Sequence, residues 1–173
     1  MFITKQESSA FIHGYTLLMV EIFGPSPAKP KKDLLEVLAA ARIKYLANRS
    51  LLDDALRTLE KKATPVSDDV VSAIRSLEVK QWIYLKDTKS HSVFIDPSGE
   101  VAYGVLGLTD RMRNIIGSSG AVVETGVVRY LGRYVTDGIV SSVVWLGPNY
   151  KTEFSSVLAD LRKAGKFHMS YAL

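Results

Sequence analysis

The spacing of hydrophobic residues changes near residue 80 of this 173-residue chain. Before that point apolar residues recur every three or four positions, which predicts amphipathic helices. Beyond it they alternate with polar residues, which predicts strands. The sequence therefore predicts an α+β protein, with a helical subdomain over residues 1–79 followed by a β-rich subdomain over residues 80–173. We expect the two subdomains to pack as one compact unit.

The helical part is expected to hold about four helices, each with a recognisable start. Thr4 and Glu7 have the spacing of a capping box, so the first helix is predicted over residues 5–23. Residues 24–32 contain three prolines, which predicts an extended connector. The next helices are expected to begin near Asp33, Ser50 and Ser67. Their inward positions are predicted to be Leu34, Leu38, Ala41, Tyr45, Leu52, Leu56, Leu59, Val70, Ile74 and Leu77.

The β-rich part is predicted to be a mostly antiparallel sheet of five or six strands, curled or closed into a small barrel, with a C-terminal helix. Strands are expected at residues 81–87, 92–96, 101–108, 122–136 and 139–146. The pair Asp137-Gly138 is a strong two-residue hairpin signal and is expected at the tip of the last hairpin. Thr109 is expected to cap a short helix that ends at Gly117. A longer helix is predicted over residues 152–164, and the tail is expected to add a short strand.

The composition narrows the possible chemistry. The chain has no cysteine, which excludes disulfides, thiolate metal sites and a cysteine nucleophile. His13, His91 and His168 have no metal-ligand spacing, so neither a metal nor another cofactor is predicted. The net charge is +4, shared evenly as +2 in residues 1–80 and +2 in residues 81–173. Such interleaved charge is typical of a solvated surface rather than of a nucleic-acid-binding stripe.

The most apolar stretch of the N-terminal region runs from Phe11 to Phe23 and is interrupted by His13 and Glu21. A secretory signal needs an uninterrupted apolar core, and a membrane span needs about 20 apolar residues. We therefore expect a cytoplasmic protein with no membrane partner.

Three polar residues lie close together in the first predicted hairpin. Asp87, His91 and Asp96 border its strands, and their convergence in a cleft would suit a small hydrolytic or phosphoryl-transfer enzyme. Aspartate is also favoured in turns for local reasons, so a purely structural role explains the same residues.

A second group of candidates lies in the strand predicted around residue 130. Arg129, Tyr130, Arg133, Tyr134 and Asp137 are candidate binding residues, because arginines beside aromatic rings are typical of single-strand nucleic-acid platforms. In one continuous strand, however, the two arginines would point to one face and the two tyrosines to the other. We therefore expect the tyrosines to pack in the core, with Arg133 able to reach Asp137.

The order of three helices and a hairpin also resembles a winged helix, a DNA-binding module. The fourth helix would then face DNA, but it begins with the acidic residues Asp68 and Asp69, and its basic residue is Arg75. Carboxylates near phosphates are repelled, so nucleic-acid binding stays the alternative rather than the leading interpretation.

Two segments, residues 82–88 (WIYLKDT) and residues 132–138 (GRYVTDG), resemble stretches of uncharacterised bacterial proteins. The resemblance spans about residues 80–165 and implies no activity. Our leading hypothesis is a non-enzymatic binding or regulatory protein of the bacterial cytosol. The apolar first helix is expected to pack either on the chain's own body or on a second copy, so a homodimer or another protein partner is the predicted partner class.

Overall fold

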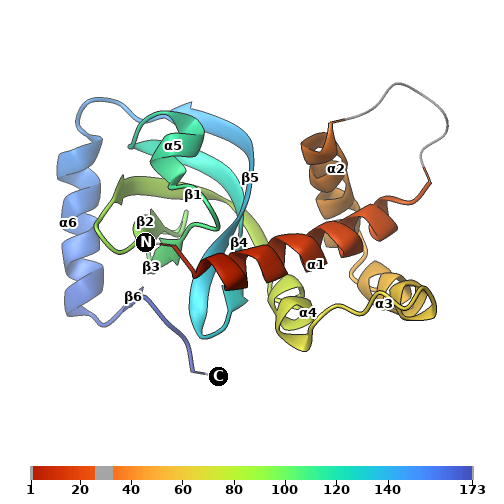
Figure 1. Cartoon of the computed structure of the whole chain (residues 1–173). Coiled ribbons are helices and arrows are strands. Elements are labelled where there is room, and N and C mark those ends of the chain that lie inside the picture. The colour runs from red at the N-terminus through yellow and green to blue at the C-terminus, as the bar shows by residue number, and fades with distance from the viewer. Residues whose placement is uncertain (1, 26–32, 173) are drawn as a thin grey trace. The chain divides into compact units, whose positions relative to one another are not determined.

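The computed structural model describes residues 2–25 and 33–172 and has an α+β fold (Figure 1). The chain forms two compact units. The first combines Met1–Ser8 with Ser76–Leu173 and contains the β-sheet, and the second is helical and covers Ser9–Arg75. Most of the predicted connector, residues 26–32, lies outside the described residues.

Four helices precede the sheet, as the sequence predicted. They are α1 (Lys5–Phe23), α2 (Leu34–Ala47), α3 (Leu51–Lys61) and α4 (Asp68–Arg75). The predicted capping box is confirmed, because the Thr4 amide donates to Glu7 Oε2 at 2.7 Å and the Glu7 amide donates to Thr4 Oγ1 at 3.2 Å. Asp33 caps α2 by accepting from the Leu35 amide at 3.5 Å.

Unit Ser9–Arg75 has its own apolar core. Its most buried side chains are Phe11, Leu18, Met19, Ala41, Tyr45, Leu52, Ala73 and Ile74. The Tyr45 hydroxyl donates to the Ile74 carbonyl at 3.1 Å, so this buried polar group is satisfied. Leu34 was predicted to face inward but is 52% exposed. It is the first residue of α2 and lies about two turns before the buried Ala41 and three turns before the buried Tyr45.

The sheet has six strands in the described chain, accompanied by two helices. The strands are β1 (Glu78–Asp87), β2 (Ser92–Ile95), β3 (Ala102–Leu106), β4 (Ala121–Tyr130), β5 (Arg133–Trp145) and β6 (Phe167–His168). The helices are α5 (Met112–Ile116) and α6 (Tyr150–Lys163). The predicted short last strand is therefore confirmed.

Five of the strands close into a small barrel. β1 pairs with both β2 and β4, β4 pairs with β5, and β3 pairs with β5 and β2. β1 achieves this because its first part, from Glu78 to Tyr84, lies along β4, while its second part, from Ile83 to Asp87, lies along β2. The β3–β5 pair is parallel, and β6 extends β3 in parallel outside the circuit. Closure removes most of the exposed strand edge that an open sheet would leave.

The last hairpin does not turn where the sequence predicted. The chain reverses at Leu131 and Gly132, which both have positive φ (48° and 77°), the backbone of a two-residue turn suited to twisted strands. The predicted turn at Asp137-Gly138 is wrong, because both residues lie inside β5.

Asp137 and Gly138 instead form part of an irregularity in the β4–β5 ladder. Thr136 pairs with Val127 and Val140 pairs with Thr125, so three β5 residues oppose Gly126 alone. The buried Asp137 carboxylate fills the gap, with Oδ1 accepting from the amides of Gly126 (3.2 Å) and Ile139 (3.0 Å). Gly138 has a positive φ of 76°, which a hairpin turn would also use, but here that conformation belongs to the irregular part of the ladder.

The start of α5 also differs from the prediction. Its N-cap is Arg111 rather than Thr109, whose hydroxyl donates to Asp110 Oδ2 at 3.2 Å. Its end is confirmed, because Gly117 closes the helix with a φ of 91°.

Apolar side chains form one layer inside the barrel wall and a second layer on its outer face. The interior layer is built on Trp82, Tyr84, Phe94, Val105, Met112, Ala121, Val123 and Val127, so α5 contributes Met112 to it. The outer layer joins α6 to strands β1, β2 and β3 through Leu85, Val93, Ile95, Ala102, Leu158 and Leu161. Strand alternation puts neighbouring residues into different layers, as with Tyr84 and Leu85.

Candidate ligand-binding site in the barrel mouth

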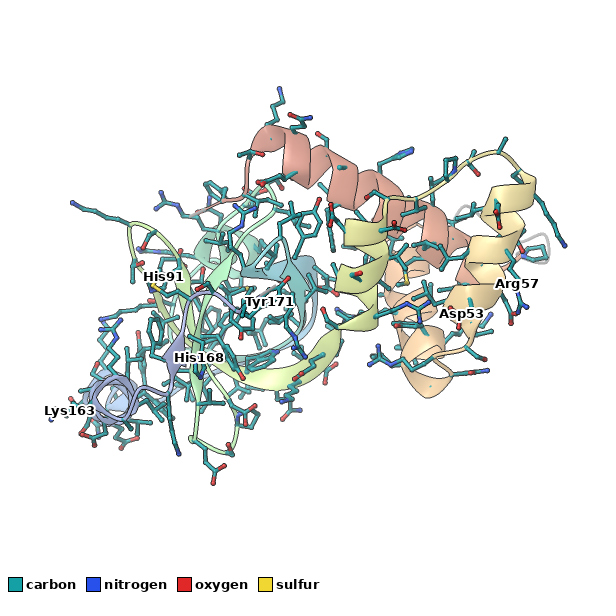
Figure 2. All side chains as sticks on the ribbon, turned by 90° about the horizontal axis from the view of Figure 1, so that it is seen from below. Asp53, Arg57, His91, Lys163, His168 and Tyr171 are labelled. Carbon is teal, nitrogen blue, oxygen red and sulfur yellow. The ribbon has the colours of Figure 1, made fainter. Side chains whose placement is uncertain are left out.

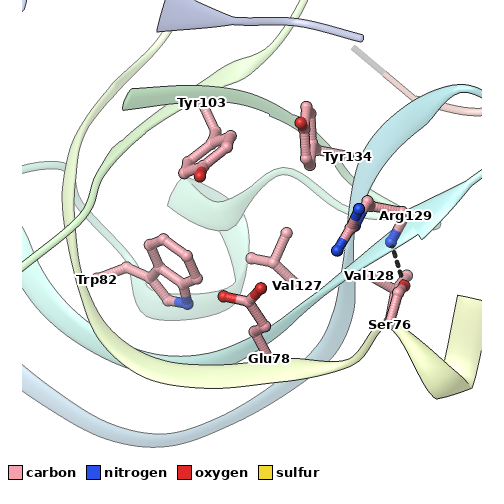
Figure 3. A pocket seen from close by; sticks show the side chains of 8 residues that line it. All are labelled: Ser76, Glu78, Trp82, Tyr103, Val127, Val128, Arg129 and Tyr134. Carbon is pink, nitrogen blue, oxygen red and sulfur yellow. Dashed lines mark hydrogen bonds between the residues drawn. The ribbon is translucent and has the colours of Figure 1, made fainter. Parts of the chain in front are cut away.

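The barrel interior opens at one end into a cavity of about 210 Å³ (Figure 3). Its lining residues are Ser76, Glu78, Trp82, Tyr103, Val127, Val128, Arg129 and Tyr134. We call this cavity the mouth pocket. Mouths of β-barrels are among the preferred places for ligand sites, since the wall strands supply side chains from several directions.

Three strands bring the aromatic side chains of the mouth pocket together. Trp82 and Tyr103 meet edge to face with ring centroids 5.8 Å apart, and Tyr103 lies 4.8 Å from Tyr134. The aromatic series continues along the C-terminal segment seen in Figure 2, because Tyr103 lies 5.9 Å from His168 and Tyr134 lies 5.8 Å from Tyr171. The indole nitrogen of Trp82 donates to the Thr125 carbonyl at 3.1 Å, which fixes that ring in place.

One edge of the mouth pocket carries a charged network. Lys80 Nζ lies 3.0 Å from both Glu78 Oε2 and Asp96 Oδ2, and 5.1 Å from the centre of the Trp82 ring. Partial burial acts to lower the pKa of the Lys80 ammonium, but its hydrogen bonds to Asp96 and Glu78 outweigh burial and raise that pKa. Burial acts to raise the pKa of Asp96, but hydrogen bonds from the Ser98 amide and from Lys80 outweigh burial and lower that pKa. Lys80 therefore serves both carboxylates.

The other edge carries Arg129. Its backbone amide donates to Ser76 Oγ at 2.8 Å, which fixes the chain here (Figure 3). Within residues 2–25 and 33–172, its guanidinium makes no hydrogen bond or ion pair. Burial raises the pKa of the neighbouring Tyr134, and the positive charge of Arg129 offsets part of that rise. Burial also raises the pKa of Tyr103. Both phenols are therefore neutral at ordinary pH.

The position of the hairpin turn decides which side chains share a face. Because the chain reverses at residues 131–132, Arg129 pairs directly with Tyr134, and Tyr130 pairs with Arg133. The prediction that the two arginines share one face is wrong, since it assumed a continuous strand.

The other cross-strand pair on this hairpin, Tyr130 with Arg133, has a structural role. The buried Tyr130 donates from its hydroxyl to the Glu7 carbonyl at 3.3 Å, and Arg133 pairs with Glu7 Oε1 at 2.6 Å. Arg133 therefore contacts Glu7 where Asp137 had been expected. Side-chain hydrogen bonds from Arg133 and backbone bonds from Thr4 lower the pKa of Glu7.

Asp87, His91 and Asp96 each have separate partners. Asp87 Oδ1 accepts from the Ser92 hydroxyl at 2.7 Å, and His91 Nδ1 lies 2.9 Å from the Ser90 hydroxyl. The buried His91 ring packs on Phe167, 5.6 Å between centroids, and burial lowers its pKa. Asp96 belongs to the Lys80 network. No interaction within the described chain joins any two of these three candidates.

Asp87 instead borders a shallow, basic depression near α5. The other residues lining it are Thr88, Lys89, Arg111, Arg113 and Asn114. His91 and Asp96 are not among them, so the depression does not gather the predicted catalytic set.

Of the residues that line the mouth pocket, sequence reasoning selected Arg129 and Tyr134 and missed the others. Glu78, Trp82 and Tyr103 were assigned to a helix end and to ordinary strand positions. The alternation of Glu78, Lys80 and Trp82 is visible in the sequence and indicates a shared face. Their meeting with Tyr103 depends on barrel closure, which no local pattern encodes.

The outer face of β2 and β3 lies beneath α6, with Val93, Ile95 and Ala102 fully buried. That face is apolar and covered, so a ligand reaches the mouth pocket and not the outer face of these two strands.

The described residues contain no group of three or more acidic or histidine side chains placed to hold a metal ion. None of the described helices is long and apolar enough to cross a membrane. Comparison with known proteins found no matching family model, curated protein or solved structure.

Proposed function

We propose that this chain is a non-enzymatic ligand-binding protein whose site is the mouth pocket. The observation that carries the proposal is the convergence of Trp82, Tyr103 and Tyr134, from three different strands, around an open cavity beside the exposed Arg129 guanidinium. Ligand sites combine an apolar, aromatic lining with a few polar groups that fix orientation, and this pocket has that composition.

The ionisable groups of the pocket support binding rather than catalysis. A general base works best with a pKa near the working pH. The two tyrosines are shifted upward, away from neutrality, and the Glu78 carboxylate is held by Lys80. The two phenols stay neutral at neutral pH, so they are suited to orienting a ligand rather than to transferring a proton.

The size of the pocket limits the part of a ligand that enters it. Pockets for drug-sized molecules are typically about 300–1,000 Å³, whereas the mouth pocket holds about 210 Å³. One or two fused rings fit, with the rest of the ligand outside.

The chain offers a direct fluorescence test. Its tryptophans are the buried Trp82 and the half-exposed Trp145, so Trp145→Phe leaves Trp82 as the single reporter. We expect ring compounds to change the Trp82 emission in a saturable manner, and Tyr103→Leu to weaken that response about tenfold, because one aromatic contact is lost. Tyr150→Leu, at the start of α6 in the outer layer, is the matched control. If no neutral, cationic or anionic ring compound produced a saturable change, the proposal would be wrong.

A second candidate function is binding of single-stranded nucleic acid. It is favoured by the finding that Arg129 and Tyr134 share a face, which removes the main sequence objection to an arginine–tyrosine platform. It predicts affinity for a labelled oligothymidylate that falls steeply with salt and falls further in Arg129→Ala. Undetectable binding at low salt would rule this candidate out.

Homodimerisation stays a prediction. Ile12 and Val20 on α1 and Ile43 on α2 are exposed apolar side chains that a second copy would cover. Light scattering of the full chain across a concentration series tests it, and a constant monomer mass would refute it.

A further inference from the structure

We propose that the mouth pocket selects a planar aromatic ring that carries an anionic group, with the ring among Trp82, Tyr103 and Tyr134 and the anion on Arg129. The inference rests on the proposed function, because it names the ligand class of the same pocket. Phosphate on a nucleotide and carboxylate on an aromatic acid share this chemistry.

The charge arrangement at the mouth identifies the sign of the ligand. Glu78 and Asp96 both lie 3.0 Å from the ammonium of Lys80, so the two carboxylates share one cationic partner within the chain. The guanidinium of Arg129 has no hydrogen-bonding or ionic partner in the described part of the chain. A guanidinium binds carboxylate or phosphate through two parallel hydrogen bonds, so an anion is the ligand group that completes this site.

A cationic ligand is the main competing interpretation. Three aromatic rings and a carboxylate form the type of cage that binds quaternary ammonium groups. In this pocket, however, the ammonium of Lys80 already lies 5.1 Å over the Trp82 ring and is bonded to Glu78. A second cation would have to displace Lys80 or approach Arg129, and both cost free energy.

The position of Arg129 separates the two ends of the ligand. Arg129 is exposed, whereas the pocket-lining Trp82 is 2% exposed and Val127 is 6% exposed. The ring therefore enters the cavity, and the anion stays at the rim, where part of its hydration is kept. This division lowers the desolvation cost of binding a charged ligand.

The test compares matched ligands that differ in charge. Titration calorimetry and Trp82 fluorescence of the Trp145→Phe chain are run with adenosine 5′-monophosphate against adenosine, and with benzoate against benzamide. Benzyltrimethylammonium is the cationic probe. We expect at least one anion to bind about tenfold or more tightly than its neutral partner, as a charge-assisted bidentate contact provides. Tighter binding of adenosine 5′-monophosphate than of adenosine identifies phosphate as the anionic group of the ligand. Tighter binding of benzoate than of benzamide identifies carboxylate.

Arg129→Gln should abolish the difference in affinity between the anionic ligands and their neutral partners. Arg57→Gln is the matched control, because it removes the same charge from the exposed face of α3 (Figure 2). Equal affinity for charged and neutral partners, an unchanged ratio in Arg129→Gln, or tighter binding of benzyltrimethylammonium would overturn the inference while leaving ligand binding intact. No saturable binding of any probe would overturn both the inference and the proposed function.

Discussion

Arg129 and Tyr134 are direct partners across the β4–β5 hairpin, and both side chains line the mouth pocket. The two residues are five positions apart, so a single continuous strand would put them on opposite faces. The turn at Leu131 and Gly132 reverses the chain between them and restores the shared face. The location of one turn therefore decides whether this barrel has a cation beside its aromatic rings.

The buried Asp137 should be important for stability. Its Oδ1 accepts from two backbone amides, of Gly126 and Ile139, in the irregular part of the ladder. Asp137→Ala would leave both buried donors unsatisfied, so we expect a loss of about 1–3 kcal/mol in the free energy of unfolding. Urea denaturation measures this loss. Asp160→Ala on the exposed face of α6 is the control, expected to change stability by less than about 0.5 kcal/mol.

Gly126 should tolerate no side chain. A Cβ atom at this position would overlap the Asp137 carboxylate and lie 2.7 Å from Leu77 Cδ1. We expect Gly126→Ala to destabilise the chain by about 1–3 kcal/mol through overpacking. Gly147→Ala introduces the same methyl group where no atom lies within 4 Å, and thermal or urea unfolding should show little change. Equal midpoints for the two variants would contradict the close approach seen here.

The pairing of Glu7 with Arg133 should make stability depend on acid pH. The pKa of Glu7 is lowered in the folded chain, so its contribution is present above the ordinary value of 4.5 and is lost as pH falls through the lowered value. Glu7→Gln should therefore be less stable than the natural chain at pH 7 and approach it by pH 3. Urea midpoints at the two pH values measure the difference, with Glu153→Gln as control. A difference that stays constant with pH would refute this role.

Leucines at different positions should respond differently to the same truncation. Leu158 on α6 is 3% exposed and packs on the outer face of the barrel, whereas Leu34 is 52% exposed. We expect Leu158→Ala to cost about 2–5 kcal/mol, because a cavity is left between α6 and the strands. Leu34→Ala should stay within about 0.5 kcal/mol. Calorimetric or urea unfolding compares them, and a large effect of Leu34→Ala would show that α2 has a partner surface in solution.

Local signals in the sequence predicted the helices well. The bounds of α1 and the capping box of Thr4 and Glu7 follow from contacts three or four residues apart, which the sequence states directly. The glycine that ends α5, Gly117, is likewise a local feature. The change from helical to alternating spacing located the start of the sheet to within two residues of Glu78.

The candidate site was less predictable. Arg129 and Tyr134 were chosen from sequence, but their faces were assigned incorrectly because the turn was expected at Asp137-Gly138 and lies at Leu131-Gly132. Asp-Gly is the stronger signal in isolation. The buried amides of Gly126 and Ile139 bind the Asp137 carboxylate, and this tertiary contact selects the other turn.

The sequence by itself determined the order of helices and strands, the capping box of Thr4 and Glu7, and the absence of thiol chemistry, because each depends on composition or on neighbours within a few residues. Only the tertiary structure decided that β3 joins β5, that α6 covers the outer face of β2 and β3, and that Trp82, Tyr103 and Tyr134 meet. These relationships join residues more than 20 positions apart along the chain. Their free energy comes from burial of shared apolar surface, which depends on where distant segments pack rather than on any local pattern.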